Sequence, residues 1–151
     1  MACIAALWLV AAISLPLSAQ TQGKTHAQKL VDETVAKHPD VLVLAMHVTP
    51  PNSSENVIIA SNIGRIGKKA DEDDLRVIRT GKPNLEVNNT GDRFEVELVL
   101  QDVSGKTIGA LGVVFPYKAG DNKSEFQRRA ERIRDDLRKQ IPTLALLFEP
   151  R

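Results

Sequence analysis

Cysteine is nearly absent from this sequence. The one cysteine among the 151 residues is Cys3, which lies in an N-terminal segment that is expected to be removed on export. About 130 residues without a thiol then remain, which is enough for one hydrophobic core. A disulfide scaffold, a thiolate nucleophile and a cysteine-based zinc site are therefore excluded. An exported domain without disulfides is typical of a bacterial periplasm.

Excess charge of one sign is also missing, and aromatic residues are few. The formal net charge is +1, so no bulk electrostatic attraction to nucleic acid is expected. Aromatic residues make up 4% of the chain, which argues against stacking platforms for bases or sugars. We therefore predict no nucleic-acid partner.

No apolar run is long enough to cross a membrane. The longest candidate, IAALWLVAAI at residues 4–13, is shorter than the roughly 20 residues that a spanning helix needs. It is followed by SLPLSAQ, and this order is typical of a secretory signal peptide. We predict a signal peptide over residues 1–20, cleaved near Ala19 or Gln20, and a periplasmic or secreted protein. No Lys or Arg precedes the run, which departs from the usual signal-peptide pattern. A buried N-terminal helix is the alternative.

The pattern of apolar residues after the signal peptide predicts one α+β domain over residues 25–141. Apolar residues at helical spacing predict a helix over 25–37, which His38-Pro39 ends. The alternation Phe94, Val96, Leu98 and Leu100 predicts a strand with one buried face. The expected elements are a long N-terminal helix, two strands (41–49, 56–61), a short helical insert, three strands (85–89, 93–101, 106–117) and a C-terminal helix that begins near Ser124 with a capping box to Gln127. Residues 142–151 are predicted to form an apolar C-terminal tail.

Three segments of the sequence, taken in their order along the chain, resemble a known family. NVIIASN (56–62) is followed by IGRIGKKADEDDLRVIRTGKP (63–83) and then by FEVELVLQDVSGKTIGALGVVF (94–115). This order is similar to that of single Cache domains, which are PAS-like extracytoplasmic sensor modules. The resemblance implies a PAS-like antiparallel five-stranded sheet and a small ligand bound beneath the 62–83 segment. Members of this family are usually joined to a transmembrane helix and a signalling output, and this sequence shows neither. A free-standing, exported sensor-type domain is therefore expected.

The charged insert at 62–83 separates into a basic half and an acidic half. Asp71 is a good N-cap for a helix over about 72–80, while Gly81 and Pro83 are typical helix-ending residues. Ile63, Ile66 and Leu75 are expected to anchor the insert. The acids are thus explained largely by capping.

Three basic residues of the insert are the main ligand-binding candidates: Arg65, Lys68 and Lys69. Arginine can bind a carboxylate through two parallel hydrogen bonds, so a small anionic ligand is the functional interpretation. A solvated loop in which Arg65 and Lys68 pair with nearby acids is the structural alternative.

Three further residues complete the predicted ligand set: His47, Ser61 and Gly109. His47 lies in the first strand, where a half-buried, hydrogen-bonded histidine is the more common role. Gly109 removes a side chain from the last strand, which marks either helix packing or a pocket floor. Glu95 and Glu97 are interpreted as part of a solvated strand face. No nucleophile–base pair and no metal-ligand motif is recognised, so neither an enzyme nor a metal or cofactor site is predicted.

Two functions remain open. The first is a binding module that takes a small molecule under the 62–83 segment. The second is a pocketless interaction module that forms a homodimer through its N-terminal helix and docks on a membrane-protein or periplasmic partner. A cavity lined by both the insert and the sheet would favour binding.

Overall fold

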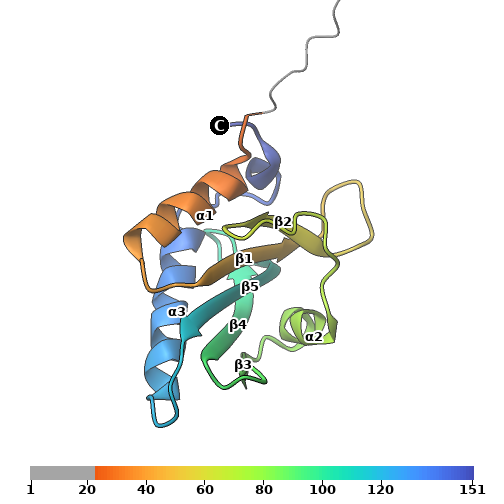
Figure 1. The fold of residues 1–151 in the computed structure, drawn as a ribbon. Helices are drawn as coiled ribbons and strands as arrows, with labels where there is room; N and C mark the ends of the chain where they lie inside the picture. The colour runs from red at the N-terminus through yellow and green to blue at the C-terminus, as the bar shows by residue number, and fades with distance from the viewer. Residues whose placement is uncertain (1–22) are drawn as a thin grey trace, which may run out of the picture.

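A five-stranded antiparallel sheet forms the centre of the fold (Figure 1). The computed structural model describes residues 23–151, so the predicted signal peptide lies outside the described residues. The strand order is β2-β1-β5-β4-β3. The strands are β1 (Val43–Val48), β2 (Val57–Ser61), β3 (Asn84–Val87), β4 (Arg93–Gln101) and β5 (Thr107–Pro116). The predicted α+β fold class and the five strands are confirmed.

Helices lie on both sides of this sheet. The helices are α1 (His26–Lys37), α2 (Glu72–Thr80) and α3 (Lys123–Arg138), and a short 3₁₀ helix, η1 (Ala145–Phe148), follows them. Figure 1 shows α1 and α3 on one face and α2 on the other, near β4. Across residues 23–151, no helix combines the length and apolar character that a membrane span requires.

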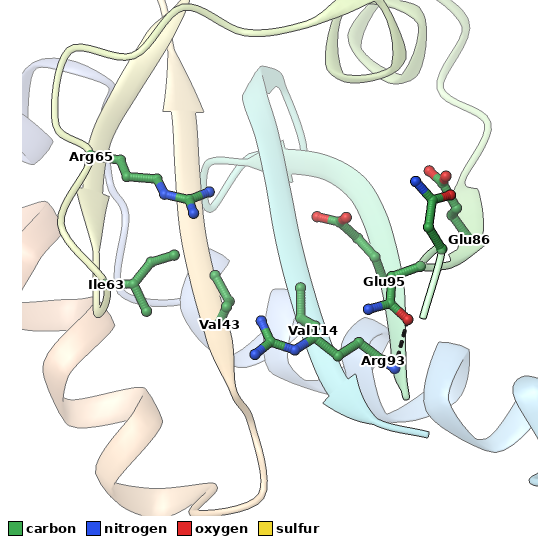
Figure 2. A pocket seen from close by; sticks show the side chains of 9 residues that line it. Val43, Ile63, Arg65, Glu86, Arg93, Glu95 and Val114 are labelled. Carbon is green, nitrogen blue, oxygen red and sulfur yellow. Dashed lines mark hydrogen bonds between the residues drawn. The ribbon is translucent and has the colours of Figure 1, made fainter. Parts of the chain in front are cut away.

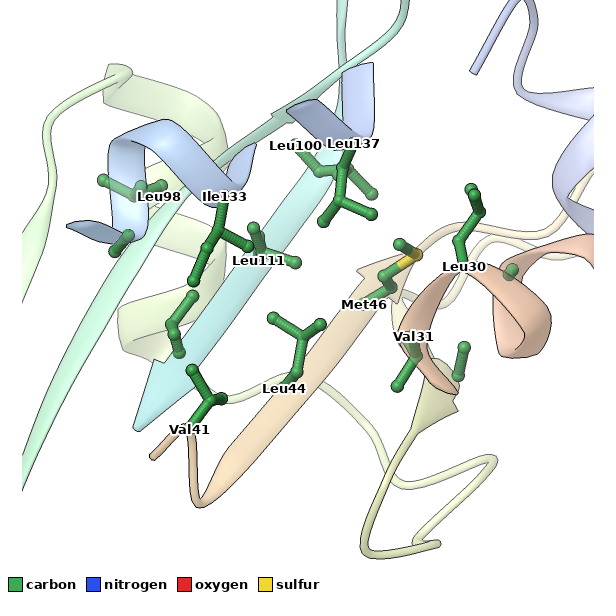
Figure 3. Packing of buried hydrophobic residues seen from close by; sticks show 14 of the residues in the cluster. Leu30, Val31, Val41, Leu44, Met46, Leu98, Leu100, Leu111, Ile133 and Leu137 are labelled. Atoms are coloured by element: carbon green, nitrogen blue, oxygen red, sulfur yellow. The ribbon is translucent and has the colours of Figure 1, made fainter. Parts of the chain in front are cut away.

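The core fills the space between the sheet and the pair α1 and α3 (Figure 3). Alternate residues of the strands point into this space because side chains along a strand alternate between the two faces. Leu44, Met46, Leu98 and Leu111 are almost fully buried there. The helices contribute matching apolar faces, namely Ala27, Leu30 and Val31 from α1 and Ala130, Ile133 and Leu137 from α3.

The N-terminus of α3 differs from the expectation. The residue that caps it is Asn122, whose side chain accepts a hydrogen bond from the backbone N–H of Ser124. The predicted capping box between Ser124 and Gln127 is therefore wrong. Asn122 takes this role because its short side-chain oxygen reaches the free N–H groups of the first turn.

The C-terminal tail packs against α1. Leu147 of η1 is fully buried. The backbone N–H of His26 donates to Glu149 O at 2.8 Å, and that of Arg151 donates to Lys24 O at 2.8 Å. These hydrogen bonds hold the two ends of the described chain next to each other.

Candidate functional site

The helix α2 is held at its start by a capping box. Asp71 Oδ1 accepts from the backbone N–H groups of Asp73 and Asp74, and Asp74 Oδ2 accepts from the N–H of Asp71 at 3.1 Å. Gly81 follows the helix with a φ of 71°, which suits glycine. The predicted cap, helix range and stop are confirmed.

The side of α2 that faces the sheet is not the predicted one. Asp74 and Val77 are buried, whereas Leu75 is 37% exposed. The expectation that Leu75 anchors the insert is therefore wrong. Asp74 takes the inward position, because its carboxylate closes the capping box and contacts His47 on the sheet.

An acidic cluster lies between α2 and β4. Asp74 and Glu97 are 2% and 6% exposed, and their carboxylates lie close to that of Asp71. Glu97 Oε2 accepts a hydrogen bond from Asn84 Nδ2 at 3.1 Å. The interpretation of Glu97 as a residue of a solvated strand face is wrong, because α2 covers this part of the sheet. The neighbouring Glu95 is half-buried on the same face.

Burial changes the acidity of this cluster. Burial, followed by the nearby Asp74 and Glu95 carboxylates, raises the pKa of Glu97 to about 8. Burial is also the largest reason why the pKa of Glu95 is raised, with the Asp74 carboxylate second. Removing a carboxylate from water disfavours its charged form, and so does a like charge nearby. Groups with shifted pKa values often gather at functional sites.

A groove of about 340 Å³ opens beside this cluster (Figure 2). The loop before α2 forms one wall and the turn between β3 and β4 forms the other. Figure 2 shows Arg65 and Arg93 extending into the same space from opposite sides, with Glu95 and Val114 between them. The lining residues are Val43, Ile63, Arg65, Glu86, Asn88, Asn89, Arg93, Glu95 and Val114. Arg93 lines the groove although the sequence does not predict it as a ligand residue.

The loop that carries Arg65 is held by its backbone. The N–H of Gly67 donates to Ile58 O, and the N–H of Ile58 donates to Lys68 O, each at 2.9 Å. Ile63 and Ile66 are 43% and 59% exposed, so the expectation that they anchor the loop is wrong. The loop instead pairs with the free edge of β2, which leaves its side chains outward.

Arg65 has an unusual backbone conformation. Its φ is 65°, and it is the one non-glycine residue with a positive φ within residues 23–151. A positive φ is uncommon for a residue with a Cβ atom and often occurs at functional positions. The side chain of Arg65 lines the groove.

The two lysines of the insert lie apart from Arg65. Lys69 forms an ion pair with Glu55, with 2.5 Å between Nζ and Oε1, and Lys68 is exposed. Neither lysine lines the groove. The structure therefore does not bring the three predicted basic residues together at one site.

His47 and Ser61 both have contacts within the fold. His47 is largely buried, and its Nδ1 lies 2.5 Å from Asp74 Oδ1. Ser61 is buried, and its Oγ accepts from the N–H of Ile63 at 3.2 Å. Neither residue lines the groove, so Ser61 positions the start of the loop and His47 belongs to the acidic cluster.

Gly109 is explained by a close approach of two strands. In the register of the sheet it lies opposite Val48 and Leu100, whose side chains are in the core. A Cβ atom on Gly109 would lie 2.1 Å from the backbone oxygen of His47. It borders a different hollow from the groove of Arg65, so a shared pocket floor is not what the structure shows.

Comparison with known proteins supports the architecture. No protein-family model matches the chain, and no curated protein is similar to it in sequence. The GAF domain of nlh2 from A. Aeolicus, in an inactive state, matches with a TM-score of 0.59 and 12% identity, over 76% of this chain and 83% of that one. The repressor BlcR of Agobacterium tumefaciens matches with a TM-score of 0.54 and 10% identity, over 78% of this chain and 67% of that one.

At these identities the likeness shows the fold alone. The narrower assignment to single Cache domains stays a prediction, while the broader PAS-like architecture agrees with the sheet order and with the matched structures. The chain therefore has a PAS/GAF-like fold, with a groove and a buried acidic cluster on the sheet face beneath α2.

Proposed function

We propose that this domain binds a small molecule carrying a carboxylate, in the groove between Arg65 and Arg93. The observation that carries the proposal is that both arginines line one groove while neither forms an ion pair with Glu86 or Glu95, the two acids that also line it. Among residues 23–151, neither guanidinium group forms an ion pair or a side-chain hydrogen bond. The structural alternative, in which Arg65 pairs with a nearby acid, therefore loses its support.

The chemistry of the groove favours a particular kind of ligand. A guanidinium group binds a carboxylate with two parallel hydrogen bonds, which gives both strength and orientation. Val43, Val114 and Ile63 supply apolar surface for a short carbon skeleton. The volume of about 340 Å³ lies at the lower end of the range for small-molecule pockets.

We also propose that the domain acts outside the cytoplasm, in the periplasm or as a secreted protein. The support is the apolar 4–13 segment followed by SLPLSAQ, the pattern of a signal peptide. N-terminal sequencing of protein recovered from the extracytoplasmic fraction should begin near Gln20. A chain in the cytoplasm that still carries Trp8 would contradict this location.

The interaction module remains the alternative function. The exposed Ile63 and Ile66 favour it, because neighbouring exposed apolar side chains are suited to a protein contact. A homodimer through the N-terminal helix has less support, since the apolar side of α1 covers its own sheet. Dimerisation and a membrane-protein partner stay predictions.

Thermal shift against a panel of small carboxylates, amino acids and phosphates tests the binding proposal. We expect at least one carboxylate to stabilise the wild type, and Arg65→Ala to weaken its affinity by roughly tenfold to a hundredfold. This range follows from the loss of about 1.5–3 kcal/mol for a charged hydrogen bond. Arg93→Ala should act in the same direction.

The matched control is Arg128→Ala, which removes an exposed arginine paired with Glu125 on α3. It should leave the affinity unchanged. If no compound stabilises the wild type, or if Arg65→Ala responds like Arg128→Ala, the groove is not the binding site. The interaction alternative would then take its place.

A further inference from the structure

The floor of the groove is one row of residues that runs across the sheet. In the register of the strands, Val43 of β1 lies opposite Val114 of β5. Val114 lies opposite Glu95 of β4, which in turn lies opposite Glu86 of β3. Directly opposite residues of antiparallel strands point to the same face of the sheet, and all four line the groove. The floor is therefore apolar over β1 and β5 and acidic over β4 and β3.

The two glutamates form a like-charged pair without a basic partner. Like charges directly opposite each other destabilise a sheet. Within residues 23–151, no lysine or arginine forms an ion pair with Glu86 or Glu95. Burial first, and then the carboxylates of Asp74 and Glu86, raise the pKa of Glu95. A positive charge beside Glu95 would offset both unfavourable effects.

The groove thus carries charges of both signs that do not neutralise each other. Arg65 and Arg93 extend into it from opposite sides, and Glu95 lies between them (Figure 2). Arg93 and Glu95 are two positions apart on β4, so their side chains leave the same face of the strand. A ligand with a carboxylate and a positive group a few bonds apart can therefore contact both without breaking an ion pair of the protein.

An organic ammonium group suits the acidic end of the groove better than a metal ion does. In the part of the chain that the structure describes, neither Glu86 nor Glu95 belongs to a set of three acidic or histidine side chains with metal-ligand spacing. Calcium takes roughly six to eight oxygen ligands. An ammonium group needs only one acceptor for each of its N–H bonds, and hydrogen bonds between charged partners are the strong ones.

We propose that Glu95, assisted by Glu86, binds an ammonium group of the same ligand whose carboxylate the two arginines hold. The ligand class is then a small amino acid or a similar short zwitterion, in preference to a simple carboxylate. Val43 and Val114 provide the surface for its carbon skeleton. This inference rests on the proposed function, because the carboxylate orients the ligand toward Glu95.

Isothermal titration calorimetry with matched pairs of compounds tests the inference. The amino acids are L-alanine, L-valine and L-leucine, and the matching acids without the amino group are propionate, isovalerate and isocaproate. We expect at least one amino acid to bind the wild type more tightly than its matching acid, by roughly tenfold or more, because it gains a hydrogen bond between charged groups.

Glu95→Gln separates a binding role from a structural one. It should weaken binding of the amino acid by roughly tenfold or more, since glutamine keeps the shape of the side chain and loses its charge. The same variant should bind the matching acid as tightly as the wild type or more tightly, because a like charge beside the ligand carboxylate is removed. A variant that only loosened the fold would weaken both. Glu86→Gln should act in the same direction with a smaller effect.

The matched control is Glu33→Gln, which changes an exposed acid on α1 and should bind both compounds like the wild type. The ammonium site is overturned if the amino acids bind no more tightly than the matching acids. It is also overturned if Glu95→Gln changes the affinity for the amino acid and for the acid alike. In both cases the carboxylate groove stands as long as Arg65→Ala still weakens binding. If neither compound of any pair binds, the proposed function is wrong and the ammonium site falls with it.

Discussion

Glu97 is an ionisable residue that lies in a buried environment. It is an acid on the central part of β4, covered by α2 and next to the carboxylate of Asp74. Its hydrogen bond from Asn84 favours the charged form, but burial and the neighbouring acids outweigh that bond. The net effect is a proton that is held more tightly in the folded than in the unfolded protein.

This proton makes the stability of the protein depend on pH. The pKa of Glu97 rises from 4.5 to about 8 on folding, so ionisation of Glu97 opposes the folded state. The free energy of unfolding should therefore fall as pH rises from about 4.5 to about 8. Glu97→Gln should reduce this fall and should be more stable than the wild type at the upper end of that range.

Urea denaturation at several pH values measures this effect. Glu33→Gln, a change to an exposed acid, should reproduce the wild-type pH profile. A wild-type stability that rises steadily across the same range would show that Glu97 is ionised in the folded protein.

At the scale of elements, α2 depends on a few local interactions. It has nine residues, too few for a stable helix in isolation. Its capping box and the buried Val77 therefore decide whether it stays on the sheet. Because α2 carries Asp71 and Asp74, the acidic cluster exists only while this helix is formed.

Removal of the cap should loosen this element. Asp71→Ala should lower the free energy of unfolding by about 1 kcal/mol, because two backbone N–H groups lose their acceptor. Asp71→Asn should stay close to the wild type, since the amide oxygen replaces the carboxylate. Chemical denaturation compares the three proteins. Equal stability of the alanine variant and the wild type would mean that the cap does not hold α2.

At the scale of the whole molecule, α1 and α3 cover one face of the sheet. The C-terminal tail forms backbone hydrogen bonds with the start of α1. The other face is only partly covered, by α2 and the loop before it. This asymmetry separates a dry core from a face that carries polar and charged groups. We therefore expect substitutions in the core to change stability, and substitutions in the groove to change the proposed ligand binding.

Truncation in the core should test the contribution of α1. Leu30 is 2% exposed and packs in the main cluster, so Leu30→Ala should lower the free energy of unfolding by ~2–4 kcal/mol. Lys29→Ala, one position along on the exposed side, should change it by less than about 0.5 kcal/mol. Similar small effects of both substitutions would mean that α1 is not packed on the domain.

Local patterns in the sequence predict the helices and strands of this protein and most of their first and last residues. The alternation in β4, the helical stripes of α1 and α3, and the cap and glycine stop of α2 are local signals. They depend on residues at most a few positions apart, where backbone geometry is the same in any fold. The fold class followed from the order of these elements.

The groups that cover the second face of the sheet depend on how distant segments pack. An alternating strand shows that two faces differ, but it does not show whether the polar face meets water or a helix. The alternation therefore predicts a solvent-exposed Glu97, although α2 covers this residue. Likewise, Arg93 meets Arg65 across the groove because β4 and the loop before α2 border the same sheet face. Such juxtapositions depend on how distant segments pack, and no local pattern of residues encodes them.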